Sequence, residues 1–460
     1  MKRFLAMCAG AVAFKAGALI TNNLAADWQG GVGITATGGR ISQWNDQHQA
    51  LNNDGLGPHH LTQGIAANQP YDITDAHGLR GAMLPWGTTN PDSLQHPKTH
   101  LNIPASLTGL STTNLTVYVV ATGPANPESQ TLVWFTGLAA GWIAFSMPGN
   151  LPANLSVGSQ SATIYPPLNR AVFVAAGAPA LTTLRWNNVL QTNSPQAVAT
   201  TGGGGRIGNF NGVDRTYYSG IIYRILVYRA AHTAAEMNAQ VAELAAKYGV
   251  FTNFTRQAVC RGDSITAGVD STMLQSYPFQ LWQRYPEIVW RNHGIGGEKI
   301  GTNGTGMTSK DASFVDPLYD PALEQNWLLY FGGVNDINGD GMSGVATYGR
   351  LTNYVAVRKA AHPWRVIVST VQNTTVAPSN VYAAFNSCIR TNAGGWDGYV
   401  DPGFGSPIET RLNNPANTNY FYWQGADAGL HLVNAGYTVI ADHFGQIVNV
   451  PRRASGTFGP

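Results

Sequence analysis

The chain has 460 residues, of which 44% are hydrophobic and only 11% are charged. This length favours two domains, and the hydrophobic content excludes a wholly disordered chain. The formal net charge of +2 gives no electrostatic reason to expect nucleic acid or an anionic membrane surface as a partner. A surface with so few charges is common in proteins that work outside the cytoplasm, so we expect an extracellular location.

The three cysteines are too few for a disulfide framework, and no Cys-x-x-Cys or His-rich tract suggests a zinc site. Cys260 and Cys388 fall in a predicted strand and a predicted helix, where we expect small buried hydrophobes. The sequence therefore predicts no cofactor and no metal.

The N-terminal segment, residues 1–23, begins with Lys2 and Arg3 and continues with a largely apolar stretch, as a secretory signal does. Lys15 interrupts this stretch, however, and the best cleavage site, after Ala26, falls within a predicted strand. Two interpretations stay open: a signal peptide, or a segment that docks the protein onto a larger assembly. No stretch reaches the ~18 uncharged apolar residues of a membrane span.

Residues 24–250 contain many short apolar runs separated by Gly, Asn, Pro and Thr, a pattern that predicts an all-β sandwich. Clear runs are 115–120, 131–135, 171–175 and 220–228. A helix follows, because Thr233 and Glu236 form a capping box and Gly249 ends the apolar stripe behind it. We place the domain boundary near Val250.

In residues 251–460 predicted strands alternate with predicted helices. The strands are 257–260, 288–291, 327–331, 365–371 and 398–400, and the helices are 278–285, 344–361, 379–392 and 434–448. This alternation predicts a doubly wound parallel sheet with helices on both faces. In such sheets ligands bind outside the carboxyl ends of the strands.

Four short motifs in this second part together supply the groups that acyl transfer requires. Ser264, in Gly262-Asp263-Ser264, is the candidate nucleophile, and His431 is the base that would remove its proton. The backbone N–H groups of Ser264 and Gly297 and the side-chain amide of Asn335 can donate to an oxyanion. We expect Asp336 to order its loop. A lone Ser would more readily be a helix N-cap and a lone His a packed imidazole, but four ordered motifs favour an enzyme.

Residues 256–450 resemble the SGNH hydrolases, also called GDSL esterases or lipases. The resemblance rests on Gly262-Asp263-Ser264, on the glycine motif that ends at Gly297, on Gly333-x-Asn335-Asp336 and on His431. It implies a flavodoxin-like three-layer fold and hydrolysis of esters, with O-acetylated sugars among the common substrates.

The last motif departs from the family, which usually has an Asp three residues before the His. Position 428 is Ala here, and the nearest acid, Asp427, stands four residues before His431. Either the loop bulges so that Asp427 orients the imidazole, or a backbone carbonyl near Ala428 does so in a Ser–His dyad. We favour Asp427, because an acceptor that orients the base has a large effect on rate.

The first half resembles a concanavalin A-like (laminin G-like) jelly roll. The resemblance lies in the segments 41–47, 60–63, 68–70 and 220–228 and in the capped helix. It implies glycan binding, although a sandwich that only spaces or oligomerises the enzyme fits as well. The residues 420–423, Tyr-Phe-Tyr-Trp, offer either an aromatic wall for a sugar ring or ordinary packing.

Three functions remain in competition. The first is a carbohydrate O-deacetylase that a lectin-like module holds on polysaccharide, in a secreted enzyme or a virion-attached tail protein. The second is a glycan-binding or structural attachment protein whose esterase site is vestigial. The third is a lipase or thioesterase for long acyl chains.

Overall fold

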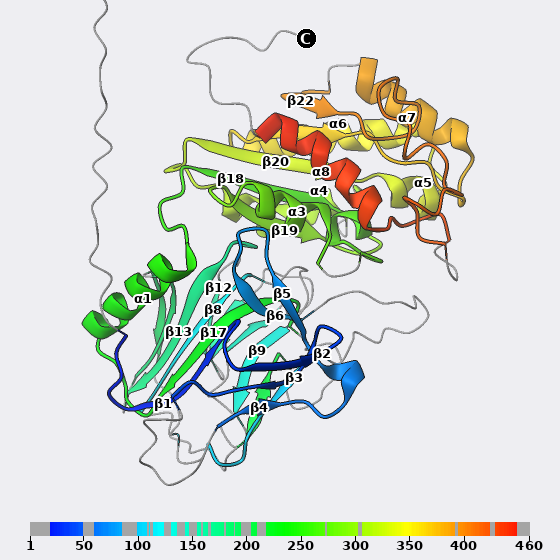
Figure 1. Cartoon of the computed structure of the whole chain (residues 1–460). Coiled ribbons are helices and arrows are strands. Elements are labelled where there is room, and N and C mark those ends of the chain that lie inside the picture. Colours follow the sequence, from blue (N-terminus) through cyan, green and yellow to red (C-terminus); the bar gives the residue numbers. More distant parts are fainter. Residues whose placement is uncertain are drawn as a thin grey trace, which may run out of the picture.

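The computed structural model describes residues 19–448 with several internal gaps. The gaps are 49–58, 85–98, 108–109, 111–113, 124–129, 136–142, 147–153, 158–159, 164–166, 179–180, 188, 195–203, 209–217, 272–273, 302–305, 392–393 and 424–427. Most of the predicted signal-like or docking segment thus lies outside the described residues. The chain forms an N-terminal half made of antiparallel strands, here called the β half, and a C-terminal α/β half (Figure 1).

The β half is one continuous antiparallel network of strands. Its elements are β1 (Leu24–Gln29), β2 (Ile34–Thr37), β3 (Arg40–Trp44), β4 (Leu61–Thr62), η2 (Ala66–Asn68), β5 (Tyr71–Thr74), β6 (Arg80–Leu84), β7 (Leu101–Ile103), β8 (Leu115–Ala121), β9 (Gln130–Phe135), β10 (Ile143–Ser146), β11 (Asn154–Val157), β12 (Gln160–Thr163), β13 (Ala171–Ala178), β14 (Leu181–Trp186), β15 (Val189–Ser194), β16 (Gly205–Ile207) and β17 (Gly220–Tyr228).

Two runs of strands face each other across a hydrophobic core. In the first run β8 lies between β17 and β13, and in the second β16 lies between β7 and β9. Val119 and Ile225 of the first run and Val133 and Ile207 of the second are buried in the same core. Successive side chains of a strand point to opposite faces of the sheet. The side chains of β8 and β17 that point away from this core must therefore be buried by another element.

Helix α1 (Ala234–Tyr248) packs on β13, and its apolar stripe joins those side chains of β8 and β17 in a second core. The predicted capping box is present: the Thr233 hydroxyl accepts the Glu236 N–H, and the Glu236 carboxylate accepts the Thr233 N–H. Gly249 ends the helix with φ 58°, a left-handed conformation that glycine adopts without strain.

The α/β half contains a parallel five-stranded sheet in the order β19-β18-β20-β21-β22. Its strands are β18 (Arg256–Gly262), β19 (Val289–Gly294), β20 (Gln325–Phe331), β21 (Arg365–Ser369) and β22 (Gly398–Val400). Its helices are α2 (Ser264–Ala267), α3 (Tyr277–Arg284), α4 (Met307–Phe314), η4 (Asp316–Leu318), α5 (Val334–Asp340), α6 (Gly344–Ala361), α7 (Ser379–Thr391) and α8 (Asn434–Val448).

Helices cover both faces of this sheet. Helix α3 packs beside α8, whereas α6 packs against α4 and α7. In Figure 1 α8 lies in front of the sheet and α6 behind it. The predicted change from an antiparallel β half to a parallel α/β half is confirmed, while α2, α4 and α5 were not predicted.

The two halves are joined by backbone and side-chain hydrogen bonds. The Leu168 N–H donates to the Trp290 carbonyl at 2.7 Å. Asn169 donates its amide to the carbonyls of Pro286 and Ile288 and accepts the Trp290 N–H. Because Asn169 is 2% exposed and uses both ends of its amide, this junction is a specific contact.

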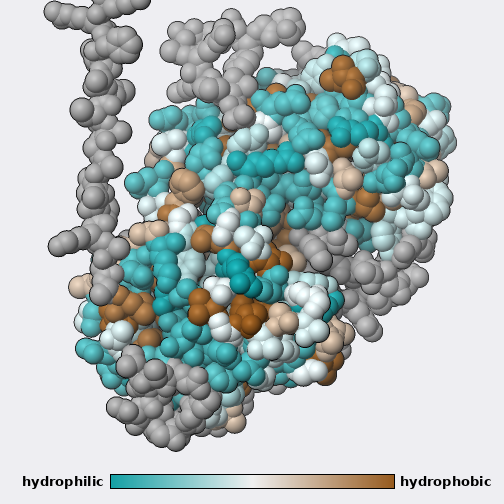
Figure 2. Space-filling view, viewed as in Figure 1, coloured by the Kyte–Doolittle hydropathy of each residue, from teal (hydrophilic) through white to brown (hydrophobic). Residues whose placement is uncertain are grey.

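The molecular face in Figure 2 is mainly hydrophilic, and its hydrophobic residues form separate patches. Among the described residues no helix combines the length and the apolar character that crossing a membrane requires. Buried Cys260 lies in the core as predicted, whereas Cys388 is half-buried.

Candidate active site

Ser264 lies at the carboxyl end of β18, where the chain turns into the short helix α2. Asp263 caps this helix, because its carboxylate accepts the Ile265 N–H at 3.0 Å. The cap is therefore Asp263, and the Ser264 hydroxyl is not needed for it. Gly262, the last residue of β18, permits close approach to β20, since a Cβ there would lie 1.9 Å from the Phe331 carbonyl oxygen.

His431 faces Ser264 directly. Its Nε2 lies 2.9 Å from the Ser264 Oγ, although the two residues are 167 positions apart in the chain. The His431 loop is held in place by an isolated bridge between Phe421 and Leu432 and by the Tyr422 N–H, which donates to the His431 carbonyl. The imidazole is 6% exposed, so its orientation is fixed by the protein.

Asp270 occupies the other side of the imidazole. Its Oδ2 lies 2.7 Å from the His431 Nδ1, and its side chain is fully buried. Asp270 has a φ of 63°, a left-handed conformation that Asp tolerates better than most residues. The Tyr437 hydroxyl donates to the carbonyl of the preceding residue, Val269, and anchors this turn.

This contact corrects the sequence prediction for the orienting acid. Asp427 itself lies outside the described residues, but the Nδ1 that it would have to reach is bonded to Asp270. The alternative of an Ala428 carbonyl fails for the same reason, since Nδ1 has its partner in Asp270. The Ala428 carbonyl accepts the Thr375 hydroxyl at 2.7 Å. The physical reason is that Asp270, only six residues after Ser264, is carried to the imidazole by the turn behind α2.

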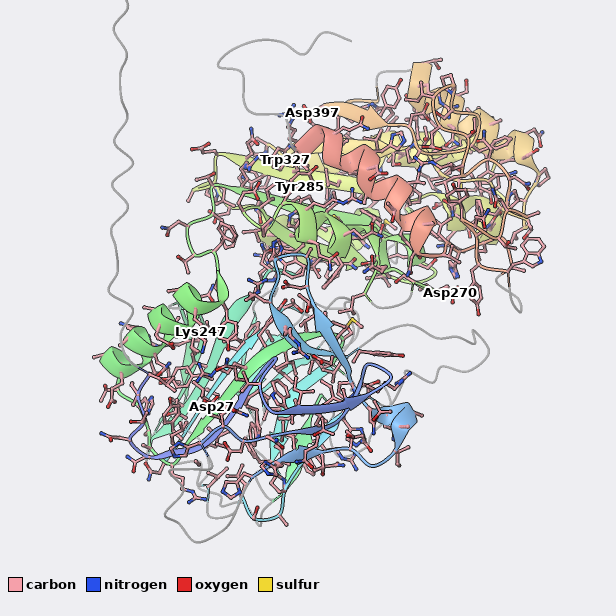
Figure 3. All side chains as sticks on the ribbon, in the orientation of Figure 1. Asp27, Lys247, Asp270, Tyr285, Trp327 and Asp397 are labelled. Atoms are coloured by element: carbon pink, nitrogen blue, oxygen red, sulfur yellow. The ribbon has the colours of Figure 1, made fainter. Side chains whose placement is uncertain are left out.

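Asp270 was missed because no fixed sequence spacing relates it to His431. The sequence did contain one signal: position 428, where the family places its acid, is Ala. The missing acid pointed to a replacement from a loop that carries another of the motifs, and Asp270 lies six residues after Ser264. Figure 3 shows Asp270 beyond one end of the sheet and Trp327, near the start of β20, toward the other.

Gly297 lies in the loop after β19, and Asn335 lies in the first turn of α5. The Asn335 Nδ2 donates to the Glu298 carbonyl at 3.1 Å, and the Ile295 N–H donates to the Gly262 carbonyl at 3.0 Å. These bonds tie the Gly297 loop and the start of α5 to the turn that carries Ser264. Gly297 has a φ of 72°, and a Cβ there would meet nothing within 4 Å. The positive φ therefore favours glycine at this position.

Asp336 orders its surroundings, as expected. Its carboxylate accepts the Ile300 N–H at 2.9 Å and pairs with Arg350 at 2.7 Å. Burial raises the pKa of the Asp263 carboxyl to about 7. The hydrogen bond from the Ile265 N–H and the nearby His431 lower this pKa but do not offset the effect of burial.

The aromatic segment 420–423 divides into packed and exposed members. Phe421 is 1% exposed and packs in the core, whereas Trp423 is 45% exposed. A Cβ on Gly429, two residues before His431, would lie 2.8 Å from the Trp423 Cζ3. The indole therefore packs against the loop that carries His431 and leaves part of its aromatic surface exposed beside this loop.

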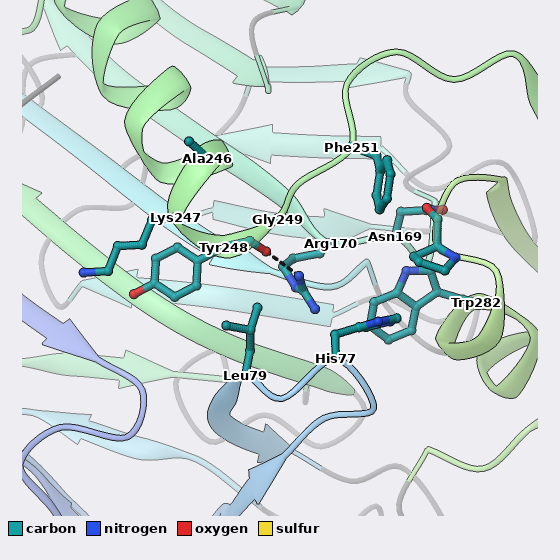
Figure 4. Close-up of a pocket in the computed structure, with 11 residues that line it drawn as sticks. His77, Leu79, Asn169, Arg170, Ala246, Lys247, Tyr248, Gly249, Phe251 and Trp282 are labelled. Atoms are coloured by element: carbon teal, nitrogen blue, oxygen red, sulfur yellow. Dashed lines mark hydrogen bonds between the residues drawn. The ribbon is translucent and has the colours of Figure 1, made fainter. Parts of the chain in front are cut away.

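A pocket of about 430 Å³ lies at the junction of the two halves, among His77, Arg170, Lys247, Phe251 and Trp282 (Figure 4). Arg170 donates to the Tyr248 carbonyl and pairs with Asp75. None of the predicted site residues lines the pocket, so we interpret it as a gap where the halves meet. In the described part of the chain no three His, Cys, Asp or Glu side chains are grouped to hold a metal ion.

Comparison with known families agrees with this geometry. Residues 260–439 match the GDSL-like Lipase/Acylhydrolase family. The match begins in β18 and ends in α8, and it contains Ser264, Gly297, Asn335 and His431. The C-terminal half therefore contains a GDSL-type hydrolase domain. No curated protein matches the chain.

Several solved structures share a weak likeness with the chain. A carbohydrate esterase of family 3 from Talaromyces cellulolyticus and an acetyl esterase mutant with acetate ion are each 17% identical, with a TM-score of 0.32. Each covers 42% of this chain and 96% of its own. Domain 4 of an arabinanase from Geobacillus stearothermophilus is 14% identical, with a TM-score of 0.31, and covers 48% of this chain and 98% of its own. At such TM-scores these likenesses define neither fold nor function.

Proposed function

We propose that the protein is a serine ester hydrolase whose catalytic residues are Ser264, His431 and Asp270. One observation carries this proposal: an unbroken hydrogen-bonded series runs from Asp270 Oδ2 through the imidazole to Ser264 Oγ, with distances of 2.7 and 2.9 Å. This is the arrangement by which a base activates a hydroxyl nucleophile and an acid orients the base.

The reaction proceeds in two acyl transfers. His431 Nε2 takes the Ser264 proton while Oγ forms a bond to the ester carbonyl carbon, and the imidazolium then protonates the departing alcohol oxygen. Water attacks the acyl-enzyme with His431 again as base, and the carboxylic acid leaves as the proton returns to Oγ. Asp270 keeps the Nδ1 proton in place and stabilises the imidazolium. It need not be protonated itself.

The N–H groups of Ser264 and Gly297 and the Asn335 amide are our proposed donors to the tetrahedral oxyanion. Asn335 uses Nδ2 to donate to the Glu298 carbonyl, and this amide nitrogen has a second hydrogen for the substrate. A donor held in place before the reaction needs no reorganisation when charge develops on the carbonyl oxygen.

For the substrate we propose an O-acetylated carbohydrate. The exposed Trp423 beside the His431 loop supports this, since a flat indole face packs well against the apolar face of a sugar ring. Release of acetate from a panel of acetylated polysaccharides tests the proposal. With p-nitrophenyl esters, we expect kcat/KM for acetyl to exceed that for octanoyl by at least about tenfold. The reverse preference would identify a lipase or thioesterase.

Trp423→Ala is expected to raise KM for acetylated polysaccharide by about fivefold to tenfold, because the sugar loses its stacking surface. Hydrolysis of p-nitrophenyl acetate, which has no sugar, should change by less than about twofold. Tyr399→Ala is the matched control, because this aromatic is 41% exposed but lies on β22. Equal loss with both esters would show that Trp423 acts on the chemistry and not on the sugar.

We further propose a flavodoxin-like three-layer fold for the hydrolase half and a concanavalin A-like jelly roll for the β half. The strand order β19-β18-β20-β21-β22 is 2-1-3-4-5 in chain order, which flavodoxin-like sheets share. A glycan-binding role for the β half, in a secreted or virion-attached protein, would concentrate substrate at the enzyme. The hydrogen-bonded junction at Asn169 supports such joint action. Binding of the inactive Ser264→Ala protein to deacetylated polysaccharide tests it.

A further inference from the structure

Glu298, which directly follows Gly297, has its carboxylate buried beneath the loop. The side chain is 3% exposed and lies 2.6 Å from the guanidinium of Arg261 and 3.0 Å from the ammonium of Lys310. Arg261 is completely buried in β18 and also pairs with Asp311 at 2.9 Å. The residue next to a proposed oxyanion donor is thus fixed to the strand that carries the nucleophile.

Few other bonds hold the segment 295–298, here called the oxyanion loop. Gly296 and Gly297 are exposed and have no side chains to pack. The backbone bonds within this loop are those from the Ile295 N–H to Gly262 and from the Glu298 N–H to the Ile295 carbonyl. A glycine pair with so little support can rotate its peptide groups readily, so the buried ion pair of the next residue is one of the few constraints on their direction.

The Glu298 carbonyl has a second role, because it accepts the Asn335 Nδ2. One residue therefore links the loop of Gly297 to the first turn of α5, which carries Asn335. Its side chain fixes the peptide next to Gly297, and its carbonyl directs the amide of Asn335. A shift of the Glu298 backbone would misplace two of the three donors together.

Resting on the proposed hydrolase function, we propose that Glu298 is a positioning residue that holds the oxyanion hole in its productive geometry through its buried ion pair with Arg261. Glu298 contacts no reacting atom. Its effect is exerted on the transition state, because that is where the positions of the donors matter most.

The test is Glu298→Gln, which keeps the size of the side chain and removes its charge. We expect kcat for p-nitrophenyl acetate to fall about 10- to 100-fold, with KM within about twofold of the original. Affinity for an alkyl boronic acid, which forms a tetrahedral adduct on Ser264, should fall by the same factor as kcat/KM. The pH profile of kcat/KM should keep its shape, since the Ser264–His431–Asp270 series is untouched.

Asp316→Asn is the matched control. Asp316 forms a similarly buried pair with Arg358 at 2.6 Å in the same half, and in the described structure it bonds to none of the motif residues. We expect this variant to keep its kcat and its affinity for the boronic acid. If Glu298→Gln does not fold, Glu298→Met replaces it and must show the same separation of kcat from KM.

A folded Glu298 variant with full kcat and full affinity for the boronic acid would overturn the positioning role. That result would leave the hydrolase function intact as long as Ser264→Ala is inactive. Activity retained in Ser264→Ala would instead overturn the proposed function itself.

Discussion

Ser264→Ala is expected to lower kcat for p-nitrophenyl acetate by at least about 10⁴-fold. The substitution removes the only atom that can form the acyl-enzyme, while the oxyanion donors and the imidazole stay in place. The fold should persist, because Asp263 and not the Ser264 hydroxyl caps α2.

The measurement is initial rate with p-nitrophenyl acetate, together with labelling by a fluorophosphonate that reacts with activated serines. Ser313→Ala is a suitable control, since that side chain is exposed and its hydroxyl donates to the Lys310 carbonyl within its own helix. We expect the control to keep its rate and its labelling. Labelling that persists in Ser264→Ala would show that another residue is the nucleophile.

Asp270→Asn is expected to lower kcat by about 10²- to 10⁴-fold. An amide in place of the carboxylate can present its NH₂ to Nδ1, which favours the tautomer in which Nε2 carries the proton and cannot act as a base. It also loses the charge that stabilises the imidazolium. Asn tolerates the left-handed backbone conformation at position 270, so the loss should not come from misfolding.

Asp427→Asn separates this assignment from the one that the sequence favoured. We expect it to keep kcat within about twofold, because the orienting position at Nδ1 is filled by Asp270. KM for p-nitrophenyl acetate should change little in either variant. A large loss in Asp427→Asn together with an active Asp270→Asn would restore the original prediction.

The vestigial-site hypothesis drew its support from the missing acid before His431. Asp270 removes that support, since the imidazole has a buried carboxylate partner from another loop. An acid from a different loop thus makes the hydrogen bond to His431 Nδ1 that the family's usual acid would make. The activity measurements above decide between an enzyme and an attachment protein.

Some elements of the fold follow directly from local sequence. The bounds of α6 and α8 agree with the predicted ranges, and α1 has the expected capping box, because apolar periodicity and capping residues act over a few positions. The helices α2, α4 and α5 were missed. Helix α5 contains Asn335, Asp336 and a Gly, which favour turns, and it forms where the chain leaves β20.

The sequence by itself determined the parallel α/β half and the common edge of Ser264, Gly297 and Asn335, because motifs that follow parallel strands meet at the carboxyl edge of one sheet. The order of the four motifs also predicted that His431 would face Ser264. Only the tertiary structure decided which acid completes the series and what holds the oxyanion loop. Asp270 contacts His431 at 2.7 Å and Glu298 contacts Arg261 at 2.6 Å, and both residues lie in irregular loops. Such contacts depend on the direction of each side chain in space, for which the spacing of residues along the chain carries no rule.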